Sequence, residues 1–511
     1  MENHVPLGSP STAGDQLLMQ RTKPLFRVEL IIIVGVFFFL ASRALFLRPD
    51  PWWDAAVYEG MGMFIFSGGE TGLWEPARPP LLPLILGSIW KLGLDPQWWG
   101  IFIGIFAGVG SLIVTFALGN LIGKKGTGTL AALFLAFTPT FFLFSQVNQT
   151  ESVSLFLSVA SLWLFVKRKY GASGFLSGLS ILTRFFQGIF AFGIFLLVCF
   201  KVFRVQPREE SKKNIVQFII ALLIPLLVYF FFNYAFYSDA FYPLSLQYWM
   251  VFNTGWIFHQ PAPYYIVGIF KENPLFLFAV FPLIRYGKML LAQIGSEKVR
   301  RQNRQKRNYS LNEKDNSLAT LLAILLLANV VPYFFAAHKE MRLVLSSFPL
   351  LAILAAKGIT DITSKFHNVG QWIWRGVLAA WVIFASFFLS CNTYDDRLDP
   401  FSLFLGAVPK EKTVWISNPS FALETGGKVT QLMYYPLYNS RRATQLSELI
   451  DGAERPDFVF LNTCDVLPCP PWDTGCPNKT VTLISKLKKE FQNEWEAASG
   501  ECEYMVFSGR V

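Results

Sequence analysis

The sequence predicts a polytopic α-helical membrane protein with about 11 transmembrane helices and a small soluble α/β domain at its C-terminus. Of its 511 residues, 53% are hydrophobic and only 16% are charged, whereas about a quarter of the residues in soluble domains are charged. The chain also has 51 Phe, more than a soluble surface could hide. Apolar runs recur through residues 28–390, and the composition becomes polar after Ser390.

The first apolar run, 28–47, follows a polar segment and is long enough to cross a bilayer, which takes roughly 20 residues. It lacks the pattern of a cleaved signal peptide, so we expect a retained first helix preceded by a cytoplasmic tail, 1–27. Further spans are predicted at 99–122, 128–145, 151–166, 214–236, 274–290, 317–336, 343–356 and 370–390.

The stretch 170–200 is apolar except near its middle, where Thr183 and Arg184 lie. Two full crossings need about 40 residues, so length alone favours one helix with a buried arginine. Basic residues both precede and follow the stretch, however, and a single crossing would place one basic cluster outside, against the positive-inside rule. We therefore expect a hairpin of two short helices with Arg184 at its outer vertex.

This hairpin completes the predicted topology, with the N-terminus in the cytoplasm and residues 391–511 outside. The transmembrane part is then 28–390, and its first external loop is 48–98. The apolar part of that loop, 79–93, is short for a span and is predicted to be an interfacial helix on the outer leaflet. The basic block 298–307 falls in a cytoplasmic loop. The net charge of +10 therefore reflects membrane topology, and no nucleic-acid partner is expected.

Residues 391–511 are predicted to form an external α/β domain, because short β-like runs alternate with helical stretches. Strands are expected at 413–417, 429–435, 457–461 and 503–508, and helices at 445–452 and 482–496. Five of the six cysteines lie in this segment: Cys391, Cys464, Cys469, Cys476 and Cys502. Their spacing fits no usual zinc pattern, so disulfides in an oxidising compartment are favoured over metal. The sequon at 478–480 is consistent with an external face.

Three acids lie near the external ends of predicted helices. Asp54 is a candidate general base that activates an acceptor hydroxyl, and Glu59, about one helical turn further, is a supporting group. The alternative for Asp54 is a solvated interfacial acid that only helps topology. Glu151 follows a tight external turn and is a second catalytic candidate. Its alternative is a helix N-terminal acid stabilised by the macrodipole.

Two arginines on the same predicted side are candidates for binding a phosphate. Arg78 offers paired donors that match a phosphate, although it would equally extend from the interfacial helix toward water. Arg184 is recessed among apolar residues, where an ionisable group usually marks function. A structural ion pair with a carboxylate is the alternative for Arg184.

The run 338–342 places three potential cations at one external helix boundary: His338, Lys339 and Arg342. Glu340 lies among them as a supporting group. Phosphate binding, with His338 assisting departure of the leaving group, is favoured over metal binding. One His and one Glu two residues apart lack the spacing of a metal-binding helix. A plain charged loop is the alternative.

Together these features resemble the glycosyltransferase C superfold, whose members use polyprenyl-phosphate sugars. Asp54 follows the first helix, and the segment 74–80 (Trp-Glu-Pro-Ala-Arg-Pro-Pro) opens an interfacial helix. The run 338–342 is similar to the His-Lys-Glu signature of the dolichyl-phosphate-mannose mannosyltransferases. Two positions depart from the pattern. Ala55 replaces a second acid, and Leu343 stands where that signature usually has Phe.

The resemblance implies an inverting transfer of a sugar, such as the hexose mannose, from a polyprenyl- or dolichyl-phosphate donor. The acceptor would be a glycan, a protein or a lipid. Asp54 would act as the base, with Arg78, Arg184, Lys339 and Arg342 around the phosphate, and a divalent cation could assist. The enzyme would be a multi-pass protein of the plasma membrane or endoplasmic reticulum, with its active site on the external or luminal face.

Two other classes of function fit parts of the sequence. A non-enzymatic transporter or lipid-linked-oligosaccharide translocase should show charges in several spans or an inverted repeat, and the sequence shows one intramembrane arginine and no such symmetry. A membrane scaffold whose C-terminal domain binds a partner would leave the clustered external charges unexplained.

Overall fold

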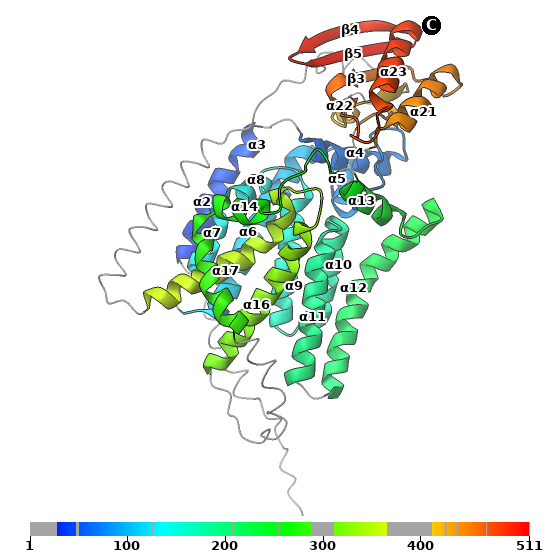
Figure 1. Ribbon diagram of the computed structural model, residues 1–511. Helices are drawn as coiled ribbons and strands as arrows, with labels where there is room; N and C mark the ends of the chain where they lie inside the picture. The colour runs from blue at the N-terminus through cyan, green and yellow to red at the C-terminus, as the bar shows by residue number, and fades with distance from the viewer. Residues whose placement is uncertain are drawn as a thin grey trace, which may run out of the picture.

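The computed structural model describes residues 28–47, 51–124, 126–205, 208–253, 255–288, 311–364, 411–424, 427–434, 437–466 and 468–509. They form a bundle of helices with a separate sheet-containing unit at one end (Figure 1). We call residues 411–509 the C-terminal unit. Several predictions lie outside the described residues: the cytoplasmic tail 1–27, the basic block 298–307, the span 370–390 and Cys391.

The bundle is built mostly from apolar helices. Among the described residues, four helical stretches are long and apolar enough to cross a membrane: Val28–Leu47, Pro96–Ile122, Lys212–Tyr237 and Met341–Thr363. A bent pair, Tyr264–Glu272 with Pro274–Lys288, would make a fifth. The elements are α2 (Val28–Ala41), α3 (Arg43–Leu47), α6 (Pro96–Ile122), α7 (Thr127–Ala136), α8 (Pro139–Phe144), α9 (Thr150–Val166), α10 (Tyr170–Thr183), α11 (Gln187–Val205), α12 (Arg208–Tyr237), α13 (Tyr242–Asn253), α14 (Tyr264–Glu272), η1 (Pro274–Ala279), α16 (Leu311–Phe334), η2 (Met341–Ser347) and α17 (Phe348–Thr363).

Most predicted spans in the described part of the chain correspond to helices, but the run 128–145 does not form one helix. It is divided into α7 and α8 at Thr138, because Pro139 begins a new helix. The carboxylate of Glu272 accepts hydrogen bonds from the backbone N–H and the hydroxyl of Thr140, at 2.8 and 2.6 Å. These bonds satisfy donors at the start of α8, which a continuous helix would have bonded internally.

The predicted break at Arg184 is confirmed. The chain leaves helical geometry at Arg184, which separates α10 (14 residues) from α11 (19 residues). Figure 1 shows these two helices side by side with α12. The stretch 170–200 therefore forms two helices, although its length alone favoured one. A consequence is that Arg184 lies at one end of both helices.

The first loop contributes two helices, α4 (Trp53–Ser67) and α5 (Leu81–Lys91), at the end of the bundle that faces the C-terminal unit (Figure 1). The two helices cross at Gly62 and Gly87, where an added Cβ on Gly62 would lie 2.6 Å from the backbone N of Gly87. Gly72, in the turn that follows α4, has φ +81°. A Cβ there would lie 2.2 Å from the carbonyl oxygen of Gly60. Glycine therefore fixes how this loop folds back onto α4.

The C-terminal unit is a five-stranded mixed sheet with helices. Its strand order is β2-β1-β3-β5-β4. The strands β2, β1 and β3 are parallel, and β5 and β4 are antiparallel to their neighbours. The elements are β1 (Thr413–Ile416), α20 (Phe421–Glu424), β2 (Lys428–Leu432), α21 (Ser440–Asp451), β3 (Phe458–Asn462), α22 (Thr463–Val466), α23 (Cys476–Glu490), β4 (Phe491–Ser499) and β5 (Cys502–Gly509).

The four predicted strands and both helices are present in this unit, but both helices begin earlier than predicted, at Ser440 and Cys476, and one strand, β4, was missed. Residues 491–496, expected to continue the last helix, form the start of β4. The segment contains helix-favouring Gln and Glu, yet it pairs with β5, to which a turn at Gly500 (φ +63°) connects it. Strand pairing therefore outweighs local helix propensity here.

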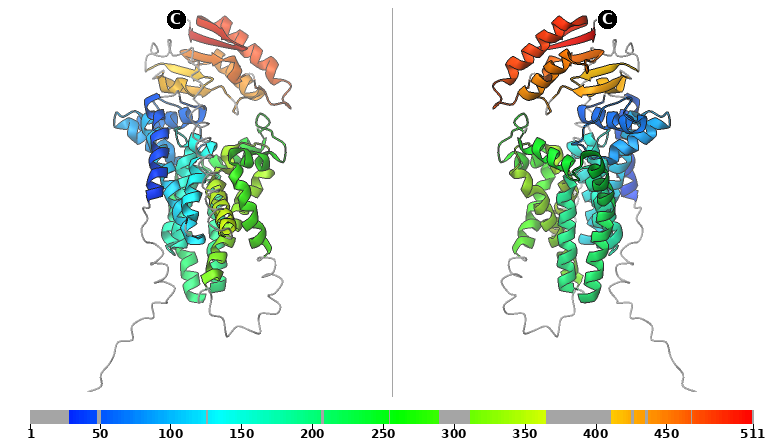
Figure 2. Two further views of the ribbon diagram at one scale, coloured as in Figure 1. Left: turned by 90° about the vertical axis from the view of Figure 1, so that its left-hand side faces the viewer. Right: turned by 90° about the vertical axis from the view of Figure 1, so that its right-hand side faces the viewer.

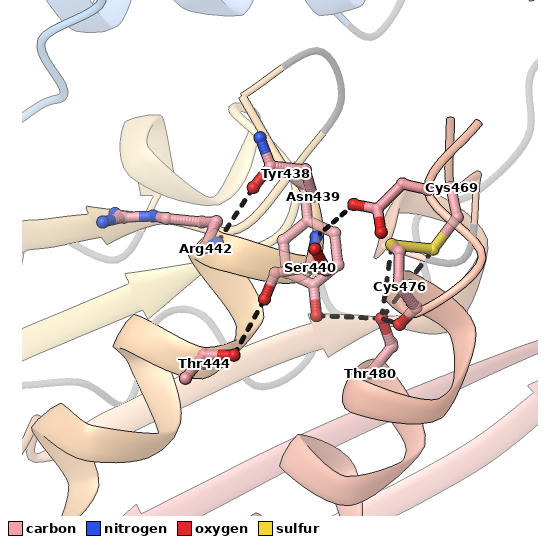
Figure 3. Close-up of a disulfide and its surroundings, with 9 residues drawn as sticks. Tyr438, Asn439, Ser440, Arg442, Thr444, Cys469, Cys476 and Thr480 are labelled. Atoms are coloured by element: carbon pink, nitrogen blue, oxygen red, sulfur yellow. Dashed lines mark hydrogen bonds between the residues drawn. A yellow bond between two sulfur atoms is a disulfide. The ribbon is translucent and has the colours of Figure 1, made fainter. Parts of the chain in front are cut away.

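The expected disulfides are confirmed. Cys464 pairs with Cys502, which ties α22 to β5, and Cys469 pairs with Cys476 at the start of α23 (Figure 3). The remaining described cysteine, Cys199 in α11, is free.

The C-terminal unit is packed against α4. Val57 and Met61 of α4 share one buried cluster with Val414, Ile416 and Phe460 of the sheet. The opposite face of the sheet is covered by α21 and α23, whose apolar residues form a second cluster. Figure 2 shows the unit stacked over the loop helices at the end of the bundle. Apolar burial thus fixes the sheet relative to the first residues of α4.

We expect Gly72→Ala to destabilise the protein more than Gly93→Ala. Both glycines have positive φ, +81° and +75°, and an alanine in that conformation costs roughly 1–2 kcal/mol. Only at Gly72 would the added Cβ also collide with backbone, since nothing lies within 4 Å of the corresponding position at Gly93. Melting temperatures of the two purified variants in detergent test this. Equal losses of stability would contradict the steric role of Gly72.

Candidate functional site

A cavity of about 680 Å³ lies between the bundle, the first loop and the C-terminal unit. Seven of the nine residues singled out from the sequence line it: Asp54, Arg78, Glu151, Arg184, His338, Glu340 and Arg342. Its walls also carry aromatic rings, including Trp52, Trp53 and Phe258. The C-terminal unit contributes Cys464, Asp465 and Pro468. Segments far apart in the chain thus meet at the end of the bundle that faces the C-terminal unit.

Asp54 lies in the first turn of α4 and is held between two arginines. Its Oδ1 is 2.8 Å from Nη2 of Arg78, and its Oδ2 is 2.5 Å from Nη1 of Arg342. Burial alone would raise the pKa of Asp54, but the charges of Arg78 and Arg342 outweigh it and hold that pKa well below its ordinary value. The carboxylate is therefore ionised at neutral pH.

A second ion pair joins the first turn of α9 to the break between α10 and α11. Nη1 of Arg184 lies 2.7 Å from Oε1 of Glu151, which is almost completely buried. The same carboxylate oxygen is 3.7 Å from Nη1 of Arg342. Thr150 donates its hydroxyl to the other oxygen of Glu151 at 3.3 Å. Arg184 therefore has a carboxylate partner, Glu151, as the structural ion-pair interpretation required. Both residues also line the cavity, as the phosphate-binding interpretation required.

Alternate residues of the run 338–342 line the cavity: His338, Glu340 and Arg342. Glu340 pairs with His338, and its Oε1 is 2.9 Å from Nη2 of Arg342. The ring of Phe258 stacks on His338 with centroids 4.3 Å apart. Lys339 is instead buried and is not among the residues that line the cavity, and its backbone N–H donates to the carbonyl of Phe258. The pattern places His338, Glu340 and Arg342 on one side and Lys339 on the other.

Glu59 lies behind the site rather than in it. It is buried on α4, and its Oε1 accepts a hydrogen bond from Nδ2 of Asn148 at 2.6 Å. Asn148 fits there because a Cβ on Gly100 would overlap its side chain. Burial is the main cause that raises the pKa of Glu59 to about 8, so this group is mostly neutral at pH 7. It joins α4 to the turn that precedes Glu151.

Two residues that support Arg78 were not predicted from the sequence, namely Glu75 and Tyr434. Glu75, which is fully buried, accepts a hydrogen bond from Nε of Arg78 at 2.8 Å. Tyr434, from the C-terminal unit, donates its hydroxyl to the other oxygen of Glu75 at 3.0 Å. The spacing of three residues between Glu75 and Arg78 is a signal that could have found the first contact. The position of Tyr434 follows only from the tertiary fold.

The site combines carboxylates with guanidinium groups. Among the residues that the structure describes, no three His, Cys, Asp or Glu side chains gather as metal ligands would. Both oxygens of Asp54 already contact arginines. Arg342 also has a buried Nε for which the described part of the chain provides no hydrogen-bond partner. An unsatisfied cationic donor beside a cavity suits an anionic ligand.

Comparisons with known proteins agree with this architecture. A family model described as dolichyl-phosphate-mannose-protein mannosyltransferase matches residues 77–231. The sequence matches no curated protein.

Several solved structures share the arrangement of elements at low sequence identity. ArnT from Cupriavidus metallidurans bound to undecaprenyl phosphate is 12% identical, with a TM-score of 0.62, over 93% of this chain and 97% of that one. The Archaeoglobus fulgidus oligosaccharyltransferase complex with Zn and sulfate is 12% identical, with a TM-score of 0.57, over 92% and 72%. The archaeal oligosaccharyltransferase AglB from the same organism, in complex with an inhibitory peptide and a dolichol-phosphate, is 12% identical. Its TM-score is 0.55, over 84% of this chain and 69% of that one.

We expect the stability of the protein to fall as the pH rises from 4.5 toward 8, in part through Glu59. Its pKa is about 8 in the folded protein and 4.5 for the exposed group, so the folded state holds the proton more tightly. This contribution is full below pH 4.5 and is lost as the pH passes 8. Glu59→Gln should flatten the decline, as measured by melting temperature across pH 5–8.5. Glu70→Gln, an exposed acid of the same loop, is the control. A decline of wild-type steepness in Glu59→Gln would contradict this role.

Proposed function

We propose that this chain, which has the glycosyltransferase C fold, is an integral membrane enzyme that transfers a sugar from a polyprenyl-phosphate donor to an acceptor hydroxyl with inversion. The observation that carries the proposal is the position of Asp54 between Arg78 and Arg342 at one cavity. A base and phosphate-binding cations have to meet at the reacting carbon, and the two arginines reach this point from segments far apart in sequence.

The three cavity arginines are suited to hold the donor phosphate. Arg78, Arg184 and Arg342 come from the first loop, the α10–α11 break and η2, and all line the cavity. A guanidinium can donate two parallel hydrogen bonds to phosphate oxygens. In the structure these groups face carboxylates, which a phosphate would partly replace as their partner. The unpaired Nε of Arg342 is a further donor.

Asp54 is the group that would accept the proton. As the acceptor oxygen forms its bond to the anomeric carbon, the bond from that carbon to the phosphate oxygen breaks. The phosphate leaves with the bonding electrons, and the hydroxyl proton passes to Asp54. Two arginines weaken Asp54 as a base in the resting site. A phosphate that attracts the same arginines would raise its pKa toward the ordinary value and so couple base strength to donor binding. Glu151 and His338 line the same cavity, and His338 could protonate the departing phosphate.

The donor and acceptor classes are supported by the relatives. The matching family model concerns dolichyl-phosphate-mannose, and two similar structures contain undecaprenyl phosphate and dolichol-phosphate. We therefore propose a hexose such as mannose as the sugar, and a protein, glycan or lipid as the acceptor.

Disulfides and the sequon Asn478–Thr480 in the C-terminal unit support an external or luminal location of the site.

We keep a transporter or lipid-linked-oligosaccharide translocase as the second candidate, because such a protein could also bind a lipid phosphate. The observation that favours an enzyme is the ionised carboxylate in direct contact with the phosphate-binding arginines. Translocation alone would need the cations but not this base.

We expect Asp54→Asn to abolish sugar transfer, because the amide cannot accept the hydroxyl proton, while expression and membrane insertion stay intact. Transfer is measured with a polyprenyl-phosphate mannose and a native acceptor extract. The matched control is Asp95→Asn, an exposed acid of the same loop that caps α6, where asparagine caps equally well. Full activity of Asp54→Asn would count decisively against the enzyme.

We expect Arg184→Ala to weaken donor binding by roughly 10-fold or more, because a charge-assisted contact to the phosphate is lost. The KM for the polyprenyl-phosphate sugar should rise, with a smaller change for the acceptor. Arg285→Ala is the control, since Arg285 is more than half exposed and pairs with Asp361 away from the cavity. An unchanged donor KM would remove Arg184 from the site.

A further inference from the structure

We infer that the C-terminal unit completes the site: Tyr434 and Glu75 are positioning residues that hold Arg78 in place beside Asp54. The inference rests on the proposed function, because it assigns the two residues a role in binding the donor phosphate. The C-terminal unit would then not only line the cavity but also orient a group that binds the donor phosphate.

The first link is Glu75, which fixes the orientation of the Arg78 guanidinium. Oε1 of Glu75 lies 2.8 Å from Nε of Arg78, while Nη2 of the same guanidinium lies 2.8 Å from Oδ1 of Asp54. A planar guanidinium held through two of its nitrogens cannot rotate freely. The ring of Tyr58 lies 5.8 Å from its central carbon and adds a third contact.

The second link is Tyr434, which controls the Glu75 carboxylate. Glu75 and Tyr434 are both completely buried, and the Tyr434 hydroxyl donates to Oε2 of Glu75 at 3.0 Å. With each oxygen bonded to a different donor, the carboxylate keeps Oε1 toward Arg78. Burial and the adjacent Glu75 carboxylate raise the pKa of Tyr434 well above its ordinary value, so the hydroxyl stays protonated and remains a donor.

The third link is the position of Tyr434 itself, which the sheet sets. Tyr434 follows β2, and its ring meets Trp53 edge-on with centroids 4.9 Å apart. Trp53 directly precedes Asp54 in α4. A backbone bridge between Gly72 and Lys428 also joins the first loop to the start of β2. The C-terminal unit therefore contacts a neighbour of each member of the Arg78–Asp54 pair: Glu75, which bonds to Arg78, and Trp53, which precedes Asp54.

Phosphate binding should depend on the hydrogen bonds from Tyr434 to Glu75 and from Arg78 to Glu75, even though neither Tyr434 nor Glu75 lines the cavity. Without the Tyr434 hydroxyl, a buried carboxylate oxygen loses its donor, and Glu75 can turn or take up a proton instead of holding Arg78. Of its three contacts, the Arg78 guanidinium would then keep only Asp54 and the ring of Tyr58. The donor phosphate would have to order it on binding, and affinity would fall because the site is less preorganised.

The test compares Tyr434→Phe with Tyr438→Phe in the full-length chain in lipid nanodiscs, with undecaprenyl phosphate as the probe. Tyr438 is a matched control: it is equally buried in the same unit, and its hydroxyl donates to Thr480 at 3.1 Å beside the Cys469–Cys476 disulfide (Figure 3). Neither Tyr438 nor Thr480 is among the residues that line the cavity. Each variant loses one buried hydrogen bond and keeps its ring. We expect similar melting temperatures for the two.

We expect Tyr434→Phe to weaken undecaprenyl phosphate binding by about 10-fold and Tyr438→Phe to change it by less than about 2-fold. Equal affinities in the two variants would overturn the inference while leaving the proposed function intact. If Tyr434→Phe fails to fold, Glu75→Gln takes its place, and an unchanged affinity there would overturn the inference equally. A wild-type protein that does not bind undecaprenyl phosphate would instead contradict the proposed function itself.

Discussion

The interaction on which the rest of the site depends is the ion pairing of Asp54 with two arginines. Arg78 and Arg342 approach opposite oxygens of one carboxylate from positions 24 and 288 residues away in the chain. A partly buried carboxylate needs compensating charge, and this requirement keeps the first loop, η2 and α4 together around the cavity. The same arrangement places Arg78 and Arg342 at the cavity, where the proposed function has them bind the donor phosphate.

The C-terminal unit is joined to this centre by apolar packing and by hydrogen bonds. Its sheet shares a buried cluster with α4, and Tyr434 reaches Glu75 beneath Arg78. The helices of the bundle and the sheet therefore meet at one charged network. This explains why Cys464 and Asp465 of the C-terminal unit line the same cavity as Asp54.

Most helices and most of the charged residues at the cavity could be predicted, because apolar composition and the distribution of charge along the chain indicate them. The apolar runs marked most helices, and the basic clusters around the stretch 170–200 revealed the break at Arg184. The isolated acid Asp54 and the run 338–342 stood out against apolar surroundings. The rest depends on tertiary contacts. Nothing local indicates that Tyr434 reaches Glu75, that Lys339 turns away from the cavity, or that β4 forms by pairing with β5.

The central claim is that a lipid-linked phosphate binds among the three cavity arginines next to Asp54. The most direct measurement is a cryo-electron microscopy map of the full-length chain with a bound polyprenyl phosphate. The account predicts phosphate density within hydrogen-bonding distance of Arg78, Arg184 and Arg342. Phosphate density at the opposite end of the bundle, with these arginines still paired to their carboxylates, would contradict it.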